Sequence, residues 1–211
     1  MKQLENVKNC YDLTAEEYTN SFYDELSHKP LDRLLLRRFA DENKNKGIIA
    51  DLGCGCGHTT AFLRDSGVEN IVGIDLSQEM IRHALRMSET IEFEVGNILD
   101  LNFAEENFGA VLAFYAIVHF TPEEVEKAFA EIYRVLKPHG QFLFSFHVGD
   151  EKKHLDEFLN QQVYVTFYFF EVEEILKILE KVGFQAAETL IRYPYKDFEF
   201  PSKRAYILAE K

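Results

Sequence analysis

Along residues 47–146, the spacing of apolar residues switches repeatedly between the pattern of a strand and the pattern of a helix. Continuous apolar runs predict four buried strands, at residues 48–52, 71–74, 110–114 and 142–146. Strict alternation over 91–95 predicts an edge strand with one wet face. Helical spacing predicts a helix over 58–66 and a second helix that begins after Ser77 as its N-cap. A third helix begins after Thr121, where the following Pro-Glu-Glu completes a capping box. This order predicts an α/β fold with a mainly parallel sheet and helices on both faces.

Residues 1–46 are polar and charged, with helical periodicity in places. Aromatic positions predict one or two short helices upstream, at Tyr11, Tyr18, Phe22 and Tyr23. A further helix starts near Pro30 and places four apolar residues on one face, namely Leu31, Leu34, Leu35 and Phe39. Because these helices precede the first strand, we expect them outside the sheet, over its ligand edge. A segment that only covers the core is the alternative.

The alternation breaks after a turn at 137–140 and the strand that follows it. A charged stretch from 148 leads into the aromatic run Val163–Phe170, which is too aromatic for an ordinary surface loop. An amphipathic helix then ends at Gly183. Residues 184–191 and 204–208 predict two closing strands that form an antiparallel hairpin at the end of the sheet.

A glycine-rich loop joins the first predicted strand to the first helix. Asp51 stands near the end of an apolar run, where a carboxylate is costly without partners. Gly53, Gly55 and Gly57 permit positive φ and let a ligand lie on the backbone. The helix beginning near His58 directs its free N–H groups and positive dipole end into the same space. The loop therefore predicts a ligand site.

The loop spacing narrows the choice of ligand. A dinucleotide fingerprint counted from Gly53 needs its third glycine at position 58, which is His58, and no Gly-Lys-Ser/Thr ending of a phosphate loop is present. In parallel sheets, ligands lie beyond the carboxyl ends of the strands. Asp75, Asn97 and Tyr115 follow three further strands, so they converge on the same edge as the loop.

These residues resemble the motifs of class I S-adenosylmethionine-dependent methyltransferases. Residues 51–57 are similar to the first motif, 71–77 with Asp75 to the second, and 96–101 to the Gly-Asp-x-x-x-Leu segment, with Asn97 in place of the aspartate. Residues 108–119 and 131–146 resemble the later regions, although Gly109 replaces a usual aspartate. The resemblance is to small bacterial enzymes with a generic methyltransferase domain, and it runs from about residue 47 to the end of the sequence.

The resemblance implies a Rossmann-like three-layer sandwich. Its mostly parallel seven-stranded sheet would have an antiparallel C-terminal strand. A helical N-terminal cap would span residues 1–46, and a single methyltransferase domain would span 47–211.

The resemblance also implies S-adenosyl-L-methionine as cofactor and S-adenosyl-L-homocysteine as product. Asp51 would accept from the amino group and Asp75 from both ribose hydroxyls, while Asn97 would accept from adenine through its carbonyl. The expected cofactor residues are Tyr11, Tyr18, Asp51, Gly53, Cys54, Gly55, Gly57, Asp75, Leu76, Met80, Asn97, Ile98, Leu99, Phe114, Tyr115 and Ala116. The structural alternatives are a helix cap for Asp75 and an ordinary turn residue for Asn97.

Cys54, Cys56 and His58 place three potential metal ligands at alternate positions. Because zinc sites normally need a fourth ligand and a wider loop, we expect no metal.

His119 is the candidate general base, which matters for an alcohol, phenol or protonated amine acceptor. A histidine that only packs or hydrogen-bonds near a helix start is the alternative. We expect Tyr11, Tyr18 and the stretch Tyr164–Phe170 to roof the acceptor pocket, and this stretch can equally be core beneath a lid. Arg192, Tyr193 and Arg204 lie near the same edge, and solvated surface is the default for all three.

Composition limits the partners. The 211 residues carry 23 basic and 36 acidic side chains, a net charge of −13, which disfavours nucleic acids and anionic membranes. Three cysteines give no disulfide framework, which is consistent with a reducing cytoplasm, and no apolar run has the length of a membrane span or signal peptide.

We therefore expect a cytoplasmic enzyme, monomeric or homodimeric, that methylates a small molecule. A binding protein that kept the cofactor site without catalysis is one alternative. A nucleotide-cofactor oxidoreductase is the other.

Overall fold

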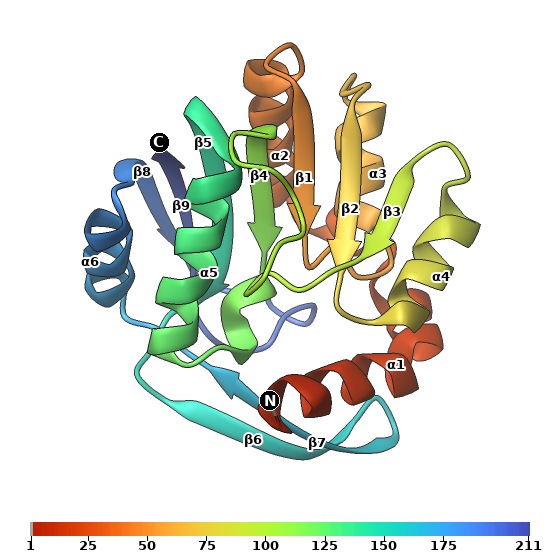
Figure 1. Ribbon diagram of the computed structural model, residues 1–211. Helices are drawn as coiled ribbons and strands as arrows, with labels where there is room; N and C mark the ends of the chain where they lie inside the picture. The colour runs from red at the N-terminus through yellow and green to blue at the C-terminus, as the bar shows by residue number, and fades with distance from the viewer. Residues whose placement is uncertain (1) are drawn as a thin grey trace.

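The computed structural model describes residues 2–211, and its centre is a seven-stranded sheet with strand order β3-β2-β1-β4-β5-β9-β8 (Figure 1). β9 runs antiparallel to both of its neighbours, whereas the pairs on the β3 side of β5 are parallel. This arrangement confirms the predicted fold class. The strands are β1 (Ile48–Leu52), β2 (Ile71–Asp75), β3 (Glu92–Val95), β4 (Phe108–Phe114), β5 (Leu136–His147), β8 (Gln185–Arg192) and β9 (Arg204–Glu210).

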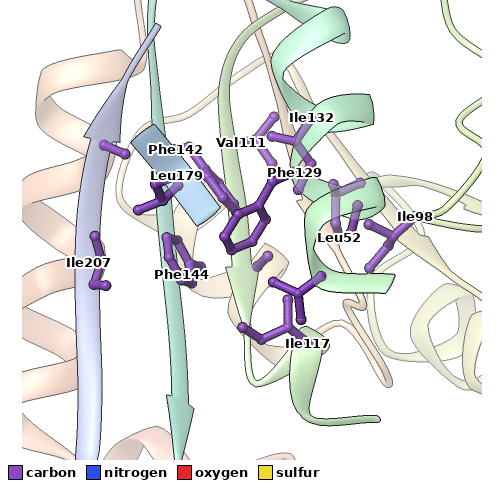
Figure 2. Close-up of a cluster of buried hydrophobic side chains, with 14 of the residues drawn as sticks. Leu52, Ile98, Val111, Ile117, Phe129, Ile132, Phe142, Phe144, Leu179 and Ile207 are labelled. Carbon is purple, nitrogen blue, oxygen red and sulfur yellow. The ribbon is translucent and has the colours of Figure 1, made fainter. Parts of the chain in front are cut away.

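Helices cover both faces of the sheet. One face packs against α2 (Pro30–Asn43), α3 (His58–Asp65) and α4 (Gln78–Met87), and the other against α5 (Pro122–Val135) and α6 (Val172–Val182). Figure 2 shows the second core layer, where the ring of Phe129 on α5 lies 5.4 Å from Phe142 and 5.0 Å from Phe144 on β5. Burying such side chains contributes about 1.5–3 kcal/mol each.

The predicted local caps are present. Ser77 accepts a hydrogen bond from the Met80 amide, and Thr121 and Glu124 form a complete capping box at the start of α5. Each such cap is worth about 1 kcal/mol.

A third group of elements lies across the carboxyl ends of the parallel strands. It consists of α1 (Lys2–Phe22), the 3-10 turns η1 (Glu25–His28) and η2 (Ala116–His119), and the hairpin β6 (Lys152–Phe158) and β7 (Gln161–Tyr168). α1 packs against β7 and α4. Asp12 of α1 accepts from the Ser77 hydroxyl (2.6 Å) and the Glu79 amide (3.3 Å), so α1 is attached to the first turn of α4. α1 therefore covers the ligand edge as predicted, whereas α2, which was expected there too, packs on a face of the sheet.

The N-terminal helices differ from the prediction in two details. α1 is one helix of 21 residues rather than one or two short ones. The buried face of α2 is rotated from the predicted one: Phe39 is buried as predicted, but Leu34 is 63% exposed and Leu36 is fully buried instead. Asp32 takes an inward position, where it pairs with Arg192 at 2.9 Å and accepts from the Tyr206 hydroxyl, also at 2.9 Å. That buried polar contact sets the rotation of the helix.

The turn predicted at 137–140 takes the form of a bulge within β5. Leu136 pairs with Phe108 and Gln141 with Ala110, so the register shifts across this segment, where His139 has φ +62°. The His139 amide donates to the Lys211 carbonyl, and the Lys211 amide to the Gly140 carbonyl. The two closing strands form the predicted antiparallel pair, and β9 inserts between β5 and β8.

Within residues 2–211, helices that combine the length and the apolar character needed to cross a bilayer are absent. The division into a cap over 1–46 and a domain over 47–211 stays a prediction.

Candidate cofactor and acceptor site

A cavity of about 330 Å³ is lined by residues at the carboxyl ends of β1, β2, β4 and β5 and by residues of α1 and the β6–β7 hairpin. Most of the predicted site residues line it, namely Tyr11, Tyr18, Gly53, Gly55, Asp75, Leu76, Met80, Asn97, Ile98, Phe114, Tyr115, Ala116 and His119. Asp51, Cys54, Gly57 and Leu99 lie outside this lining. The structure thus brings together residues that are up to 108 positions apart in the sequence.

The glycine loop combines close packing with open space. Gly53 has φ +71°, and a Cβ there would lie 2.7 Å from the Cβ of Ala116, so only glycine fits. Gly55 has φ +53°, and the nearest atom to its Cβ position is Tyr18 Cε1 at 3.7 Å. The backbone at Gly55 is therefore open toward the cavity.

The other loop residues serve packing. A Cβ on Gly57 would lie 2.8 Å from Phe93 Cζ, so this glycine makes room for an aromatic core residue. Cys54 and Leu99 are buried in the two main cores. Burial raises the pKa of the Cys54 thiol, so it stays protonated.

Asp75 closes the loop on the cavity side. Its Oδ2 accepts from the Gly55 amide at 2.9 Å, and its Oδ1 accepts from the Ser77 amide at 2.8 Å. Burial raises the pKa of Asp75 to about 6 despite these bonds, and the negative charges of Asp51 and Asp12 add to the effect. Asp75 is a pre-positioned carboxylate that gains from further hydrogen-bond donors.

Asp51 supports the loop from behind. It is fully buried, and its Oδ2 accepts from the Thr59 hydroxyl at 2.7 Å and the Thr60 hydroxyl at 2.6 Å. Its Oδ1 has no hydrogen-bond partner among the described residues. Burial raises the pKa of this carboxyl. The free oxygen is the kind of buried acceptor that a ligand donor or a bridging water satisfies.

Asn97 forms a local turn. Its Oδ1 accepts from the Leu99 amide at 3.0 Å, so the carbonyl expected to face adenine already has a backbone donor. A carbonyl oxygen has a second lone pair. Both interpretations of Asn97, as a turn residue and as a cofactor contact, stay compatible with its place in the cavity wall.

Tyr115 holds a strained backbone at the end of β4. Its φ is +54°, which is costly for a residue with a bulky side chain, and its amide donates to the carbonyl and the hydroxyl of Ser145, each at 3.1 Å. Its hydroxyl lies 3.2 Å from that of Tyr206. These contacts fix the ring in the cavity wall.

His119 is buried with both ring nitrogens engaged. Nδ1 lies 2.9 Å from the Thr166 carbonyl, which only accepts, so Nδ1 carries the hydrogen. Nε2 lies 2.8 Å from the Tyr11 hydroxyl and therefore accepts from it. Burial lowers the pKa of His119 to about 4, against the Thr166 bond. The imidazole is neutral at physiological pH, with one fixed tautomer.

The residues of the predicted aromatic roof differ in burial and in whether they line the cavity. Phe167 and Phe158 line the cavity, and the Phe167 ring centroid lies 4.4 Å from that of His119. Tyr164 is 63% exposed, whereas Phe169 and Phe170 are core. The predicted stretch therefore supplies one cavity wall residue, and Phe158 was missed because β6 reads as an ordinary charged segment.

The cysteine–histidine group has other partners. The Cys56 Sγ lies 3.8 Å from His58 Nδ1, and His58 Nε2 pairs with Glu25 at 3.1 Å. In the described part of the chain, clusters of three or more potential metal ligands are absent. His58 thus connects the glycine loop to η1.

The expectation that Arg192 and Arg204 are solvated at the surface is wrong. Their side chains are 9% and 4% exposed and contact the buried carboxylate of Glu199. Tyr193, at 76% exposed, is on the surface as expected. Lys29 and Glu199 also line the cavity and were not identified. The sequence contains one indication of their role, which is that each lies next to an element that ends at the ligand edge.

Comparisons with known proteins match this architecture. Residues 49–140 match the family described as "Methyltransferase domain". An uncharacterized methyltransferase of Bacillus subtilis (YcgJ) is 35% identical over 117 residues, covering 53% of this chain and 45% of that protein. A phosphoethanolamine N-methyltransferase of Plasmodium falciparum is 28% identical over 185 residues, covering 86% and 67%. The chain spans about half the length of the two Bacillus relatives it matches, YcgJ and YqeM.

Solved structures share the fold. Magnesium protoporphyrin IX methyltransferase from Synechocystis, with bound S-adenosylmethionine, superimposes with a TM-score of 0.76 at 17% identity, covering all of this chain and 98% of the other. The PH0226 protein from Pyrococcus horikoshii gives a TM-score of 0.69 at 24% identity, covering 92% and 95%. The sheet order is thus that of the Rossmann-like fold of these methyltransferases. The sequence matches identify a methyltransferase domain over residues 49–140 and, with the fold, support a class I S-adenosylmethionine-dependent methyltransferase.

Proposed function

We propose that this protein transfers a methyl group from S-adenosylmethionine to a small-molecule acceptor. One observation carries the assignment: a single cavity joins the glycine loop and Asp75 at one end to the Tyr11–His119 pair and an aromatic wall at the other. A donor site and an acceptor site then share one cavity.

The residues present fit the cofactor. Asp75 offers a fixed carboxylate to the ribose hydroxyls, and Gly55 leaves the backbone open beside it. Asp51 Oδ1 is a buried oxygen without a donor among the described residues and, because Asp51 lies outside the cavity lining, it would reach the amino group through a water. Leu76, Met80 and Ile98 supply an apolar wall suited to adenine. When bound, S-adenosylmethionine supplies an electrophilic methyl group on a sulfonium.

The cavity walls provide positioning and exclusion of water, which supply most of the catalysis for an in-line displacement. Tyr11 and Tyr18 of α1 pack edge to face, with ring centroids 5.9 Å apart. Phe158 packs against Tyr11 from the hairpin, at 6.4 Å. This roof keeps the acceptor dry beside a reactive cation.

His119 acts through Tyr11 in this proposal. Because Nε2 is the free base and Tyr11 donates to it, the pair can accept a proton from an acceptor hydroxyl or ammonium that hydrogen-bonds to Tyr11. The fixed Nδ1 hydrogen on Thr166 keeps the ring in this orientation. Tyr11 is thus the group that touches the acceptor, and His119 receives the charge.

A small molecule suits the cavity better than a polymer. The volume is about 330 Å³, at the lower end for drug-sized ligands. The net charge of −13 repels phosphate backbones. A cytoplasmic location and a monomeric or homodimeric state go with this proposal.

Transfer of radiolabelled methyl groups to a fractionated metabolite extract tests the activity. Wild-type protein is expected to label a low-molecular-weight fraction, and the Asp75→Ala variant is expected to lose that label. Calorimetry on the same preparation is expected to show binding of S-adenosylhomocysteine. Cofactor binding with no labelled fraction would favour a sensor, and tighter binding of NAD would favour an oxidoreductase.

A further inference from the structure

A buried ionic cluster forms another part of the cavity wall. Glu199 is its centre: Arg192 donates to both carboxylate oxygens at 2.6 and 2.8 Å, Arg204 Nε lies 3.4 Å away and Lys29 Nζ 3.8 Å away. Arg192 also reaches Asp32 at 2.9 Å. The same network therefore joins η1, α2, β8, β9 and the loop between the last two strands.

A second carboxylate extends the cluster toward the glycine loop. Glu25 accepts from Lys29 at 2.8 Å and lies 3.1 Å from His58 Nε2. Burial alone would lower the pKa of His58, but its contacts with Cys56 and Glu25 raise that pKa to about 10, so His58 is charged at neutral pH. Every side chain of this group thus has an oppositely charged neighbour.

The charges do not balance. Four cationic side chains, Lys29, His58, Arg192 and Arg204, face three carboxylates, Glu25, Asp32 and Glu199. Burial raises the pKa of Asp32 in spite of Arg192, so Asp32 contributes at most one negative charge. An uncompensated buried charge is costly. Among these seven side chains the excess of one cation comes from His58, which pairs with Glu25 at 3.1 Å, and an anionic ligand would balance it.

Two of the cations face the cavity. Lys29 and Arg204 are 8% and 3% exposed, and both line the space. Arg204 Nη1 donates to the Phe200 and Ser202 carbonyls, whereas its Nε has no hydrogen-bond partner among the described residues. Glu25 and Glu199 also line the cavity, but both are already held by cations. This part of the cavity wall thus contains one buried donor without a hydrogen-bond partner among the described residues, Arg204 Nε, which lies 3.4 Å from Glu199, and both carboxylates are paired with cations.

The walls around these cations are aromatic. Tyr115, His147, Phe198 and Phe200 line the same cavity. Burial, then the positive charges of Arg204 and Lys29, lower the pKa of His147 to about 4. The imidazole is neutral and adds no third cation.

We propose that this part of the cavity binds the carboxylate or phosphate group of an acidic acceptor with an apolar body, through Lys29 and Arg204. This inference rests on the proposed methyl transfer, because it names the substrate class of that reaction. Sulfonium, ammonium and carboxylate give S-adenosylmethionine a net charge of +1, so a bound cofactor increases the demand for an anionic acceptor.

The carboxylate of the cofactor is the competing source of the anion. Arg204 begins β9, which is three strands from β1 in the sheet order. At about 4.8 Å per strand, the glycine loop and Arg204 are about 14 Å apart across the sheet. That separation places Arg204 away from the glycine loop, whereas Lys29 is connected to His58 at the loop through Glu25, so the test below includes cofactor affinity.

The test uses the full chain saturated with S-adenosylhomocysteine. Benzoate and phenyl phosphate are titrated in parallel with benzyl alcohol and benzylamine, at equal ionic strength, by calorimetry. We expect the two acids to bind and the alcohol and the amine to bind at least tenfold more weakly. Lys29→Gln is expected to weaken acid binding tenfold or more, Lys29→Arg to retain it within threefold, and Lys127→Gln, on the exposed side of α5, to leave it unchanged.

Equal binding of the amine or the alcohol overturns the inference. So does a Lys29→Gln variant that loses tenfold in S-adenosylhomocysteine affinity while its acid binding is unchanged, because the cation would then serve the cofactor. If Lys29→Gln does not fold, the comparison of acids with the amine on wild type still decides. Failure of wild type to bind S-adenosylhomocysteine refutes the proposed function, whereas cofactor binding without acid binding refutes this inference alone.

Discussion

Replacing Asp75 by asparagine separates the proposed cofactor contact of this residue from its structural role. The asparagine side chain would keep the shape of the aspartate but lose its charge and one acceptor oxygen. Hydrogen bonds to a charged group contribute about 1.5–3 kcal/mol each. With two ribose hydroxyls as donors and part of the interaction retained, we expect a loss of about 2–3 kcal/mol, or about 30- to 150-fold in Kd for S-adenosylhomocysteine.

The pH dependence of binding provides a second, independent readout. Only ionised Asp75 accepts from both hydroxyls, and its pKa in the ligand-free protein is about 6. Affinity of the wild type is therefore expected to be constant above pH 7 and about tenfold weaker at pH 5 than at pH 8. Asp75→Asn is expected to show no such change, and Asp65→Asn, at the exposed end of α3, to behave as wild type.

The stability of the ligand-free protein should respond with the opposite sign. A carboxyl whose pKa is raised from 3.8 to about 6 on folding stabilises the fold below pH 4, and this contribution is lost as the pH rises through 6. The free energy of unfolding of Asp75→Asn, relative to wild type, is thus expected to increase by about 1–3 kcal/mol from pH 4 to pH 7 in urea titrations. Binding of S-adenosylhomocysteine to the variant within threefold of wild type, or a wild-type affinity independent of pH, would refute the reasoning.

Three further substitutions test other parts of the structure. Gly53→Ala adds a Cβ at positive φ within 2.7 Å of a neighbouring side chain, so urea unfolding should show a loss of at least about 2 kcal/mol; a neutral result would contradict the close packing of the loop against Ala116. Tyr11→Phe removes the donor to His119, so methyl transfer should slow about 10- to 100-fold while calorimetry gives an unchanged cofactor Kd. An unaltered rate would leave the pair with a packing role only. Leu36→Ala should cost about 3 kcal/mol in chemical denaturation and Leu34→Ala under about 0.5, and equal costs would contradict the orientation of α2.

The predictable parts of the fold are those set by local sequence. The Thr121 capping box, the Ser77 cap and the edge strand over 91–95 depend on neighbours within a few residues, so the pattern alone located them. The face of α2 was mispredicted for the opposite reason. Asp32 turns inward because Arg192, 160 residues later, pairs with it there. Apolar periodicity contains no information about such a partner.

In the site, too, the parts set by local sequence were predictable and the parts set by distant partners were not. The glycine loop and Asp75 could be located because each ends a strand and the strand order is shared by the family. The pairing of Tyr11 with His119 spans 108 residues, and that of Lys29 with Glu199 joins segments from opposite ends of the chain. Arg204 was expected on the surface because an arginine beside a proline- and serine-containing loop usually is. Its burial depends on β9 entering between β5 and β8, which a single sequence does not specify.

The contact of Asp12 with Ser77 has a kinetic consequence. The Ser77 amide donates to Asp75, and the Ser77 hydroxyl donates to Asp12 of α1. Ser77 therefore connects the Asp75 carboxylate to the helix that covers the proposed acceptor site. In this proposal, a cofactor that hydrogen-bonds to Asp75 also fixes the position of α1 through Ser77. An acceptor that bound first would meet α1 before its position is fixed. We therefore expect a compulsory order of addition, with S-adenosylmethionine entering first and S-adenosylhomocysteine leaving last. Product inhibition by S-adenosylhomocysteine would then be competitive toward the methyl donor and non-competitive toward the acceptor.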